Sequence, residues 1–182
     1  SKEWGTANLK GYFNGAAYAD LDNDGDLDML VNVLKGKALV LKNNTPKKNS
    51  LSISLKGNAA NTKGVGAKVY VYAAGQMQMQ HLMPTRGFQS SSDMVLHFGL
   101  NDATVADSVL VVWPGNSYEV QFKVPANKPH QLQQVNAKAG FDRQAYFPAA
   151  APVWEDATAT SGINWRHTEN DFVDFNRQYL IP

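Results

Sequence analysis

Apolar and polar residues alternate through the middle of the chain. Residues 51–55 read Leu-Ser-Ile-Ser-Leu, and residues 67–73 and 76–82 repeat this period of two, separated by Ala74 and Gly75. Such a period is typical of a β-strand with one buried face, and the two-residue separator predicts a tight hairpin turn. Further short runs of strand-forming residues predict strands at 95–98, 108–113, 118–122 and 130–135.

The region 50–136 shows no period typical of a helix. Its seven short predicted strands are separated by turns that contain Gly, Pro and Asn. This arrangement indicates an antiparallel β-sandwich or a small barrel. The fold class predicted for the whole chain is therefore all-β.

The first 45 residues follow another plan. A short apolar segment at 15–19 and the apolar runs 28–33 and 38–43 flank an acidic stretch and a turn, which predicts a small antiparallel sheet. Residues 45–50 are polar and contain a proline, so they predict a hinge before the sandwich. Residues 138–152 are rich in alanine, contain two prolines and predict a linker.

The acidic stretch carries a carboxylate at every second position, and Gly25 lies in its middle. Unit charges 4 Å apart repel by roughly 1 kcal/mol even in water, so a folded chain keeps such a cluster if a cation neutralises it or if it is splayed into solvent. Oxygen donors without His or Cys favour Ca²⁺. The candidate ligands are Asp20, Asp22, Asp24, Asp26 and Asp28.

The spacing matches the first half of an EF-hand loop, with Gly25 in the sixth place. It departs afterwards, since Val31 takes the place of the bidentate Glu and the next residues predict a strand. We expect Asp28 and the three residues Asp20, Asp22 and Asp24 to offer side-chain oxygens. Asp26 is expected to offer its backbone carbonyl and to turn its carboxylate outward. The alternative is an acidic hairpin turn that holds no ion.

Composition and charge exclude several classes of protein and of site. The 182 residues are 43% hydrophobic and 18% charged, which suffices for a packed core, and the net charge of +1 predicts no nucleic-acid partner. The absence of cysteine excludes disulfides and thiolate chemistry. No apolar run approaches 18 residues, which predicts no membrane insertion by this fragment. The first residues resemble no signal peptide, so we expect a signal or lipid anchor on a missing upstream part.

The residues predict no catalytic site. A hydrolase needs a nucleophile with a base or a carboxylate pair, and no G-x-S-x-G motif occurs. His97 lies within an alternating strand and is interpreted as a structural histidine rather than a base. Arg86 could clamp a carboxylate, or it could satisfy loop carbonyls within the sandwich. We expect that the chain is not an enzyme.

Residues 13–28, from Phe13 to Asp28, resemble an FG-GAP (VCBS-type) repeat. That family forms β-propeller blades and carries its Ca²⁺ loop between the first two strands of a blade. The resemblance implies that residues 1–45 form a partial propeller blade whose neighbours belong to flanking propeller domains of the same chain. Residues 153–165 resemble the lead-in to a second such propeller, so 137–182 are interpreted as linker and lead-in.

Residues 50–136 resemble an ASPIC/UnbV domain through motifs that occur in the same order. These are Asn61 with residues 64–69, then 85–91, 96–100 and 111–115. Asn101 and Asn116 depart from the family's usual turn residues. The domain commonly follows FG-GAP repeats in bacterial surface proteins and in relatives of cartilage acidic protein. The resemblance therefore implies an antiparallel β-sandwich after the blade.

Together these features predict a non-catalytic, calcium-binding module for adhesion or ligand binding at the cell surface or outside the cell. The expected ligand is an unknown protein or glycan. The alternative is an accessory domain of a larger glycan-processing enzyme, with catalysis elsewhere. An enzymatic domain beside these modules in the full-length protein would favour the alternative.

Overall fold

The computed structural model describes residues 2–168. The chain divides into two compact units, Ser1–Asp142 and Arg143–Pro182. The final part of the expected lead-in, residues 169–182, lies outside the described residues. The predicted boundary between residues 45 and 50 falls inside the first unit and stays a prediction.

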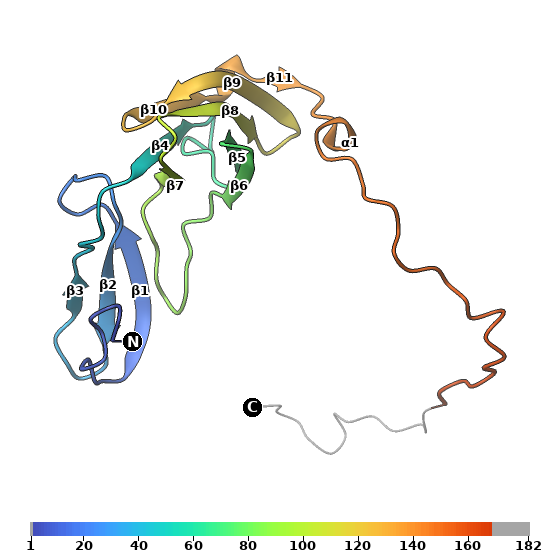
Figure 1. Cartoon of the computed structure of the whole chain (residues 1–182), viewed down its shortest axis with the longest axis horizontal. Helices are drawn as coiled ribbons and strands as arrows, with labels where there is room; N and C mark the ends of the chain where they lie inside the picture. The colour runs from blue at the N-terminus through green and yellow to red at the C-terminus, as the bar shows by residue number, and fades with distance from the viewer. Residues whose placement is uncertain (1, 169–182) are drawn as a thin grey trace. The chain divides into compact units, whose positions relative to one another are not determined.

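The first unit begins with a three-stranded antiparallel sheet, which we call the N-terminal sheet (Figure 1). Its strands, in spatial order, are β1 (Phe13–Ala19), β2 (Asp28–Val33) and β3 (Leu39–Leu41). The pairs Ala16–Val31 and Tyr18–Met29 place four side chains on one face. The sequence predicted these three strands and the acidic connection between the first two.

A register shift interrupts β1 between Phe13 and Ala16. Gly15 has a φ of +75°, and a Cβ built there would lie 2.5 Å from Ser90 Oγ and 2.9 Å from the Phe88 carbonyl oxygen. No side chain fits this gap, so only glycine allows the loop around Ser90 to lie directly on β1.

Eight strands follow and form two sheets, and seven of them, β4 to β10, lie where the sequence predicted strands (Figure 1). The smaller sheet has the order β10-β4-β7 and the larger one β11-β9-β8-β5-β6. Their bounds are β4 (Asn49–Lys56), β5 (Lys68–Ala73), β6 (Gln76–His81), β7 (Leu96–Asn101), β8 (Val105–Val112), β9 (Ser117–Pro125), β10 (Pro129–Gln133) and β11 (Lys138–Ala139). The sandwich is thus confirmed as all-β.

One pairing is parallel. Strand β10 runs parallel to β4, with Leu132 beside Leu55 and His130 beside Ile53. All other pairings between the strands of the structure are antiparallel. A parallel neighbour requires a long crossover, and here the chain builds most of the second sheet before it returns to β4. Local alternation carries no information on this direction.

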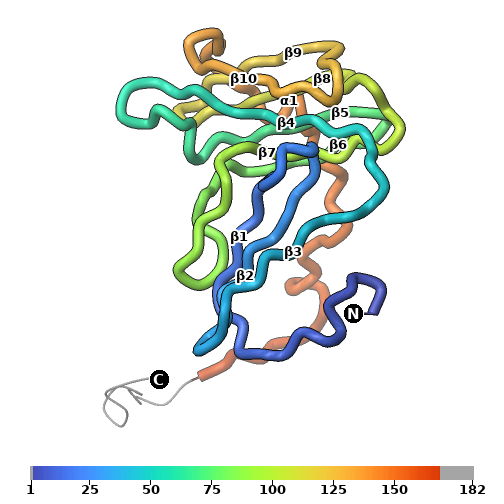
Figure 2. The backbone as a smooth tube through the Cα atoms, turned by 90° about the vertical axis from the view of Figure 1, so that its left-hand side faces the viewer, coloured from blue at the N-terminus to red at the C-terminus, as the bar shows by residue number. Residues whose placement is uncertain are grey.

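The two sheets enclose one apolar core. Phe98 is 0% exposed and Trp113 is 2% exposed. The smaller sheet contributes alternate residues of β4, β7 and β10, and the larger sheet contributes alternate residues of β5 and β8. Members of the core are Leu51, Ile53, Leu55, Val69, Val71, Leu96, Phe98, Leu100, Val109, Val111, Trp113 and Leu132. Figure 2 shows the backbone of the strands of both sheets.

Two glutamines connect the sheets along one side. Gln78 Nε2 on β6 donates to the carbonyl oxygen of Gly99, 2.7 Å away on β7, and Gln80 Nε2 donates to the carbonyl oxygen of His97. We call this pair of contacts the glutamine seam. It occupies backbone acceptors of β7, which is an edge strand of the smaller sheet.

The segment predicted as a linker is not without structure. Strand β11 pairs with β9 through Lys138–Tyr118 and Ala139–Ser117, and a short helix α1 (Arg143–Tyr146) opens the second unit. The pairing with β9 is long-range and only two residues long, which explains why no local pattern predicts it. Within residues 2–168, no helix is long and apolar enough to span a bilayer.

Candidate metal site

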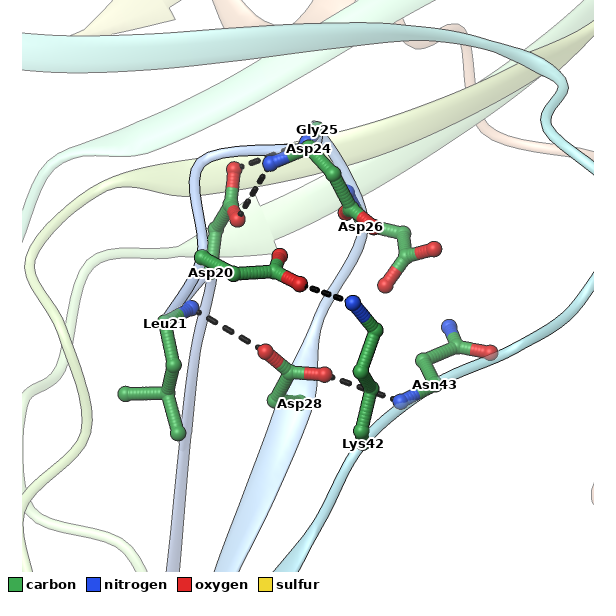
Figure 3. A network of polar contacts seen from close by, with 9 residues as sticks. Asp20, Leu21, Asp24, Gly25, Asp26, Asp28, Lys42 and Asn43 are labelled. Atoms are coloured by element: carbon green, nitrogen blue, oxygen red, sulfur yellow. Dashed lines mark hydrogen bonds and ion pairs between the residues drawn. The ribbon is translucent and has the colours of Figure 1, made fainter.

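The acidic loop connects β1 to β2 and is folded around its own carboxylates (Figure 3). Asp20 accepts hydrogen bonds from the backbone N–H of Asp24, at 3.0 Å, and of Gly25, at 2.9 Å. Gly25 has a φ of +96°, which an L side chain rarely adopts. The glycine of the D-x-D-x-D-G pattern therefore makes the sharp turn that its position predicted.

Asp28 anchors the loop from below. It is 4% exposed and accepts hydrogen bonds from the backbone N–H of Leu21, at 3.2 Å, and of Asn43, at 2.8 Å (Figure 3). These bonds tie the beginning of the loop to the segment that follows β3. A buried carboxylate is stabilised by such backbone donors. Asp28 is thus a structural acceptor in this conformation, whatever further contacts its oxygens make.

Three of the predicted ligands converge. One carboxylate oxygen each from Asp20, Asp22 and Asp24 lies within 4.8 Å of the other two. Among residues 2–168, these three aspartates are the group whose side-chain oxygens lie close enough together to hold a metal ion. Asp24 also accepts from the backbone N–H of Asp26, at 3.1 Å. The alternating spacing therefore gathers carboxylates at one point, as the sequence predicted.

Lys42 already lies beside this cluster. Its ammonium forms an ion pair and hydrogen bond with Asp22. The hydrogen bond to Lys42 holds the pKa of Asp22 below its ordinary value, and the same hydrogen bond raises the pKa of Lys42. Both side chains are substantially exposed, so the pair contributes little to stability.

Asp26 differs from the expectation. Its Oδ1 atom is buried and accepts no hydrogen bond, whereas its carboxylate was predicted to face outward. Burial, followed by repulsion from Asp24 and Asp28 and then from Asp22 and Asp20, raises the pKa of Asp26. A buried carboxylate oxygen without a donor is costly, and a cation would satisfy it.

The sequence reasoning missed the residues that complete this network. Lys42 and Asn43 follow β3 and were not assigned to the site. Because β3 runs antiparallel to β2, with Leu41 opposite Met29, the chain returns to the first residues of β2. The predicted antiparallel strands at 28–33 and 38–43 already imply that residues 42 and 43 lie beside the acidic loop.

The acidic loop also touches the sandwich, since Ser50 Oγ, on β4, donates to the Gly25 carbonyl oxygen at 3.3 Å. A second contact joins β1 to the sandwich, because the N–H of Asp93 donates to the Tyr18 carbonyl oxygen at 3.5 Å.

His97 and Arg86 lie in the sandwich part. His97 Nδ1 hydrogen-bonds with Ser52 Oγ at 3.2 Å, while His97 Nε2 is buried without a partner. Burial lowers the pKa of His97, and the nearby carboxylates of Asp93 and Asp20 act in the opposite direction. Arg86 is exposed, and its Nη2 donates to the carbonyl oxygen of His81, the last residue of β6, at 3.5 Å.

No curated protein matches the chain. The expected FG-GAP repeat, which includes the acidic loop, stays a prediction. The model of the ASPIC and UnbV family matches residues 57–139, so the ASPIC/UnbV resemblance is confirmed for this part of the chain.

Proposed function

We propose that the chain is a non-catalytic, calcium-binding module of a secreted or surface-displayed protein, and that it serves adhesion or the binding of a protein or glycan. The observation that carries the proposal is the convergence of one oxygen each from Asp20, Asp22 and Asp24 within 4.8 Å. Ca²⁺ prefers carboxylate and carbonyl oxygens and accepts irregular geometry.

The donor set fits such an ion. Asp26 adds a buried oxygen without a hydrogen-bond donor, and mutual repulsion raises its pKa. A divalent cation would coordinate the buried oxygen of Asp26 and would also offset the repulsion among the carboxylates. The Lys42 ammonium neutralises only one of the charges, and it would compete with the ion at Asp22. A site of modest affinity suits the millimolar Ca²⁺ outside cells.

The ligand-binding part of the proposal is supported by one face of the sandwich. Met77 and Met79 are about half exposed, at 48% and 50%, and Phe122 is 74% exposed. The strand pairings Met77–Tyr72, Tyr72–Ser108 and Ser108–Phe122 place these apolar side chains on the same face of the larger sheet. Exposed apolar side chains that gather on one face favour a contact surface.

Thermal unfolding in EDTA and in millimolar Ca²⁺ tests the cation. Ca²⁺ at ten times its Kd should add about 1.4 kcal/mol to the free energy of unfolding, which raises Tm by roughly 3–6 °C. Asp22→Asn and Asp24→Asn should abolish this increment, because each removes a charged donor from the cluster. Asp107→Asn, at an exposed position of β8, is the matched control and should keep it.

Equal melting of the unaltered chain in EDTA and in Ca²⁺ would contradict the calcium proposal. The ligand part is tested separately, by a glycan array and a pull-down with the intact protein. Binding that Met79→Asp and Phe122→Asp leave unchanged would contradict the assignment of the exposed face.

A further inference from the structure

A hollow lies on the N-terminal sheet, where the 84–92 loop of the sandwich meets β1. Its volume is about 360 Å³, which falls within the range of small-molecule sites. Residues of β1 and β2 line most of it, among them Phe13, Ala16, Tyr18, Met29 and Val31, and Arg86 lines it from the 84–92 loop.

The sequence of β1 and β2 explains why the hollow is there. Ala16 pairs with Val31 and Tyr18 pairs with Met29, so these four side chains share one face. On this face Ala16 is the small residue between Phe13 and Tyr18, so it leaves a gap there, whereas the space over Gly15 is filled by Ser90 and Phe88. The wall that the sheet contributes is therefore apolar.

The 84–92 loop is held in one conformation beside the hollow. Thr85 and Ser91 form an antiparallel bridge, and the N–H of Arg86 donates to the Ser90 carbonyl oxygen at 2.9 Å. The N–H of Ser92 donates to the Pro84 carbonyl oxygen, also at 2.9 Å. These bonds fix the backbone position of Arg86 at the rim.

Arg86 is the one charged residue among those that line the hollow. Within residues 2–168 it forms no ion pair, and its side chain donates the 3.5 Å hydrogen bond to the His81 carbonyl oxygen. Guanidinium groups bind carboxylates through paired, charge-assisted hydrogen bonds. The remaining donors of Arg86 are therefore suited to an anion at the mouth of an apolar cavity.

We propose that this hollow binds a small carboxylic acid with an apolar body, such as an aryl or branched-chain acid. The carboxylate pairs with Arg86, and the apolar part lies against Ala16, Tyr18 and Met29. Charge complementarity selects the anion, since a cationic ligand would meet the guanidinium and find no carboxylate in the lining. Sugars and nucleotides require more polar or cationic groups than this lining offers.

Ligand-observed NMR on the whole chain tests the proposal, with phenylacetate as the probe and phenylacetamide as its uncharged analogue. The experiment is done in EDTA, so that the result is independent of the proposed cation. Phenylacetate should bind, and the amide should bind about tenfold or more weakly, because it loses the charge-assisted bonds.

Two variants locate the site. Arg86→Gln should weaken phenylacetate binding about tenfold or more, whereas Arg143→Gln, in the second unit, should leave it unchanged. Ala16→Leu should also abolish binding, because the larger side chain fills the gap while Arg86 stays in place. Both variants are checked by thermal unfolding, and Ala16 is exposed, so its substitution leaves the fold intact.

Equal binding of the acid and the amide would overturn the proposal, as would unchanged binding to Arg86→Gln. Sedimentation of the same samples distinguishes another occupant. Self-association that Ala16→Leu abolishes, without phenylacetate binding to the unaltered chain, would assign the hollow to a second copy and refute the small-ligand site.

Discussion

Residues up to 50 and residues after 50 differ in what they bury. In the sandwich, the core is a continuous apolar cluster that includes Phe98 and Trp113. Among residues 2–50, Asp28 is the one buried residue. The sandwich is therefore stabilised by apolar area, whereas the N-terminal sheet is organised by a polar network.

The sandwich provides most of the stability, whereas the N-terminal sheet contains the candidate metal site. The N-terminal sheet exposes apolar side chains on both faces, Met29 at 42% on one and Leu30 at 38% and Val40 at 64% on the other, and it contains the acidic cluster. A three-stranded sheet of this kind gains little from burial. Its order therefore depends on Asp28, on its contacts with the sandwich and on whatever neutralises its charges.

The largest effect is expected in the sandwich core. Phe98→Ala removes a ring that is 0% exposed and should lower the free energy of unfolding by about 3–5 kcal/mol. Val40→Ala removes an exposed side chain from the N-terminal sheet and should cost about 0.5 kcal/mol or less. Chemical denaturation of both variants checks this, and similar losses would contradict the contrast.

An intermediate effect is expected at Asp28. Asp28→Asn replaces one acceptor oxygen with a donor, so one of the N–H groups of Leu21 and Asn43 loses its partner, at a cost of about 1–3 kcal/mol. Hydrogen exchange should accelerate in β2 and β3 and stay unchanged in β5 and β8. Uniform acceleration over both parts would show that they unfold as one cooperative unit.

The smallest effect concerns pH. Because burial lowers the pKa of His97, the folded chain binds fewer protons than the unfolded chain just below the ordinary value of 6.5. His97 therefore costs stability as the pH falls from 6.5 through its lowered pKa, and it costs nothing above 6.5.

His97→Gln should reduce the fall in Tm between pH 7 and pH 5, because the variant has no imidazole to protonate. The measurement is the difference between the variant and the unaltered chain, which cancels the titration of the acidic loop. An identical pH dependence of both proteins would contradict the assignment of this cost to His97.

Strand positions in the sandwich were predictable because each depends on the alternation of apolar and polar residues within the strand itself. Alternation at 51–55 predicts which residues of β4 face the core, and Leu51, Ile53 and Leu55 are buried. The parallel pairing of β10 with β4 and the two-residue strand β11 depend on distant partners. Local patterns do not encode such pairings.

In the candidate site, too, the residues of one turn were predicted, and the residues from distant segments were not. The spacing of Asp20, Asp22 and Asp24 predicts their convergence, because they belong to one turn. Lys42 and Asn43 arrive from another strand, and the buried oxygen of Asp26 depends on how the loop packs. The hollow beside Arg86 was not predicted, since it requires two segments separated by about 70 residues of sequence.

The glutamine seam affects how the chain behaves at high protein concentration. An edge strand with open carbonyl groups is a template on which a second chain can add a strand. Gln78 and Gln80 occupy the carbonyl oxygens of Gly99 and His97, so this stretch of β7 offers fewer acceptors to a neighbour. Two uncharged side chains thereby protect the molecule from strand-by-strand aggregation at that edge.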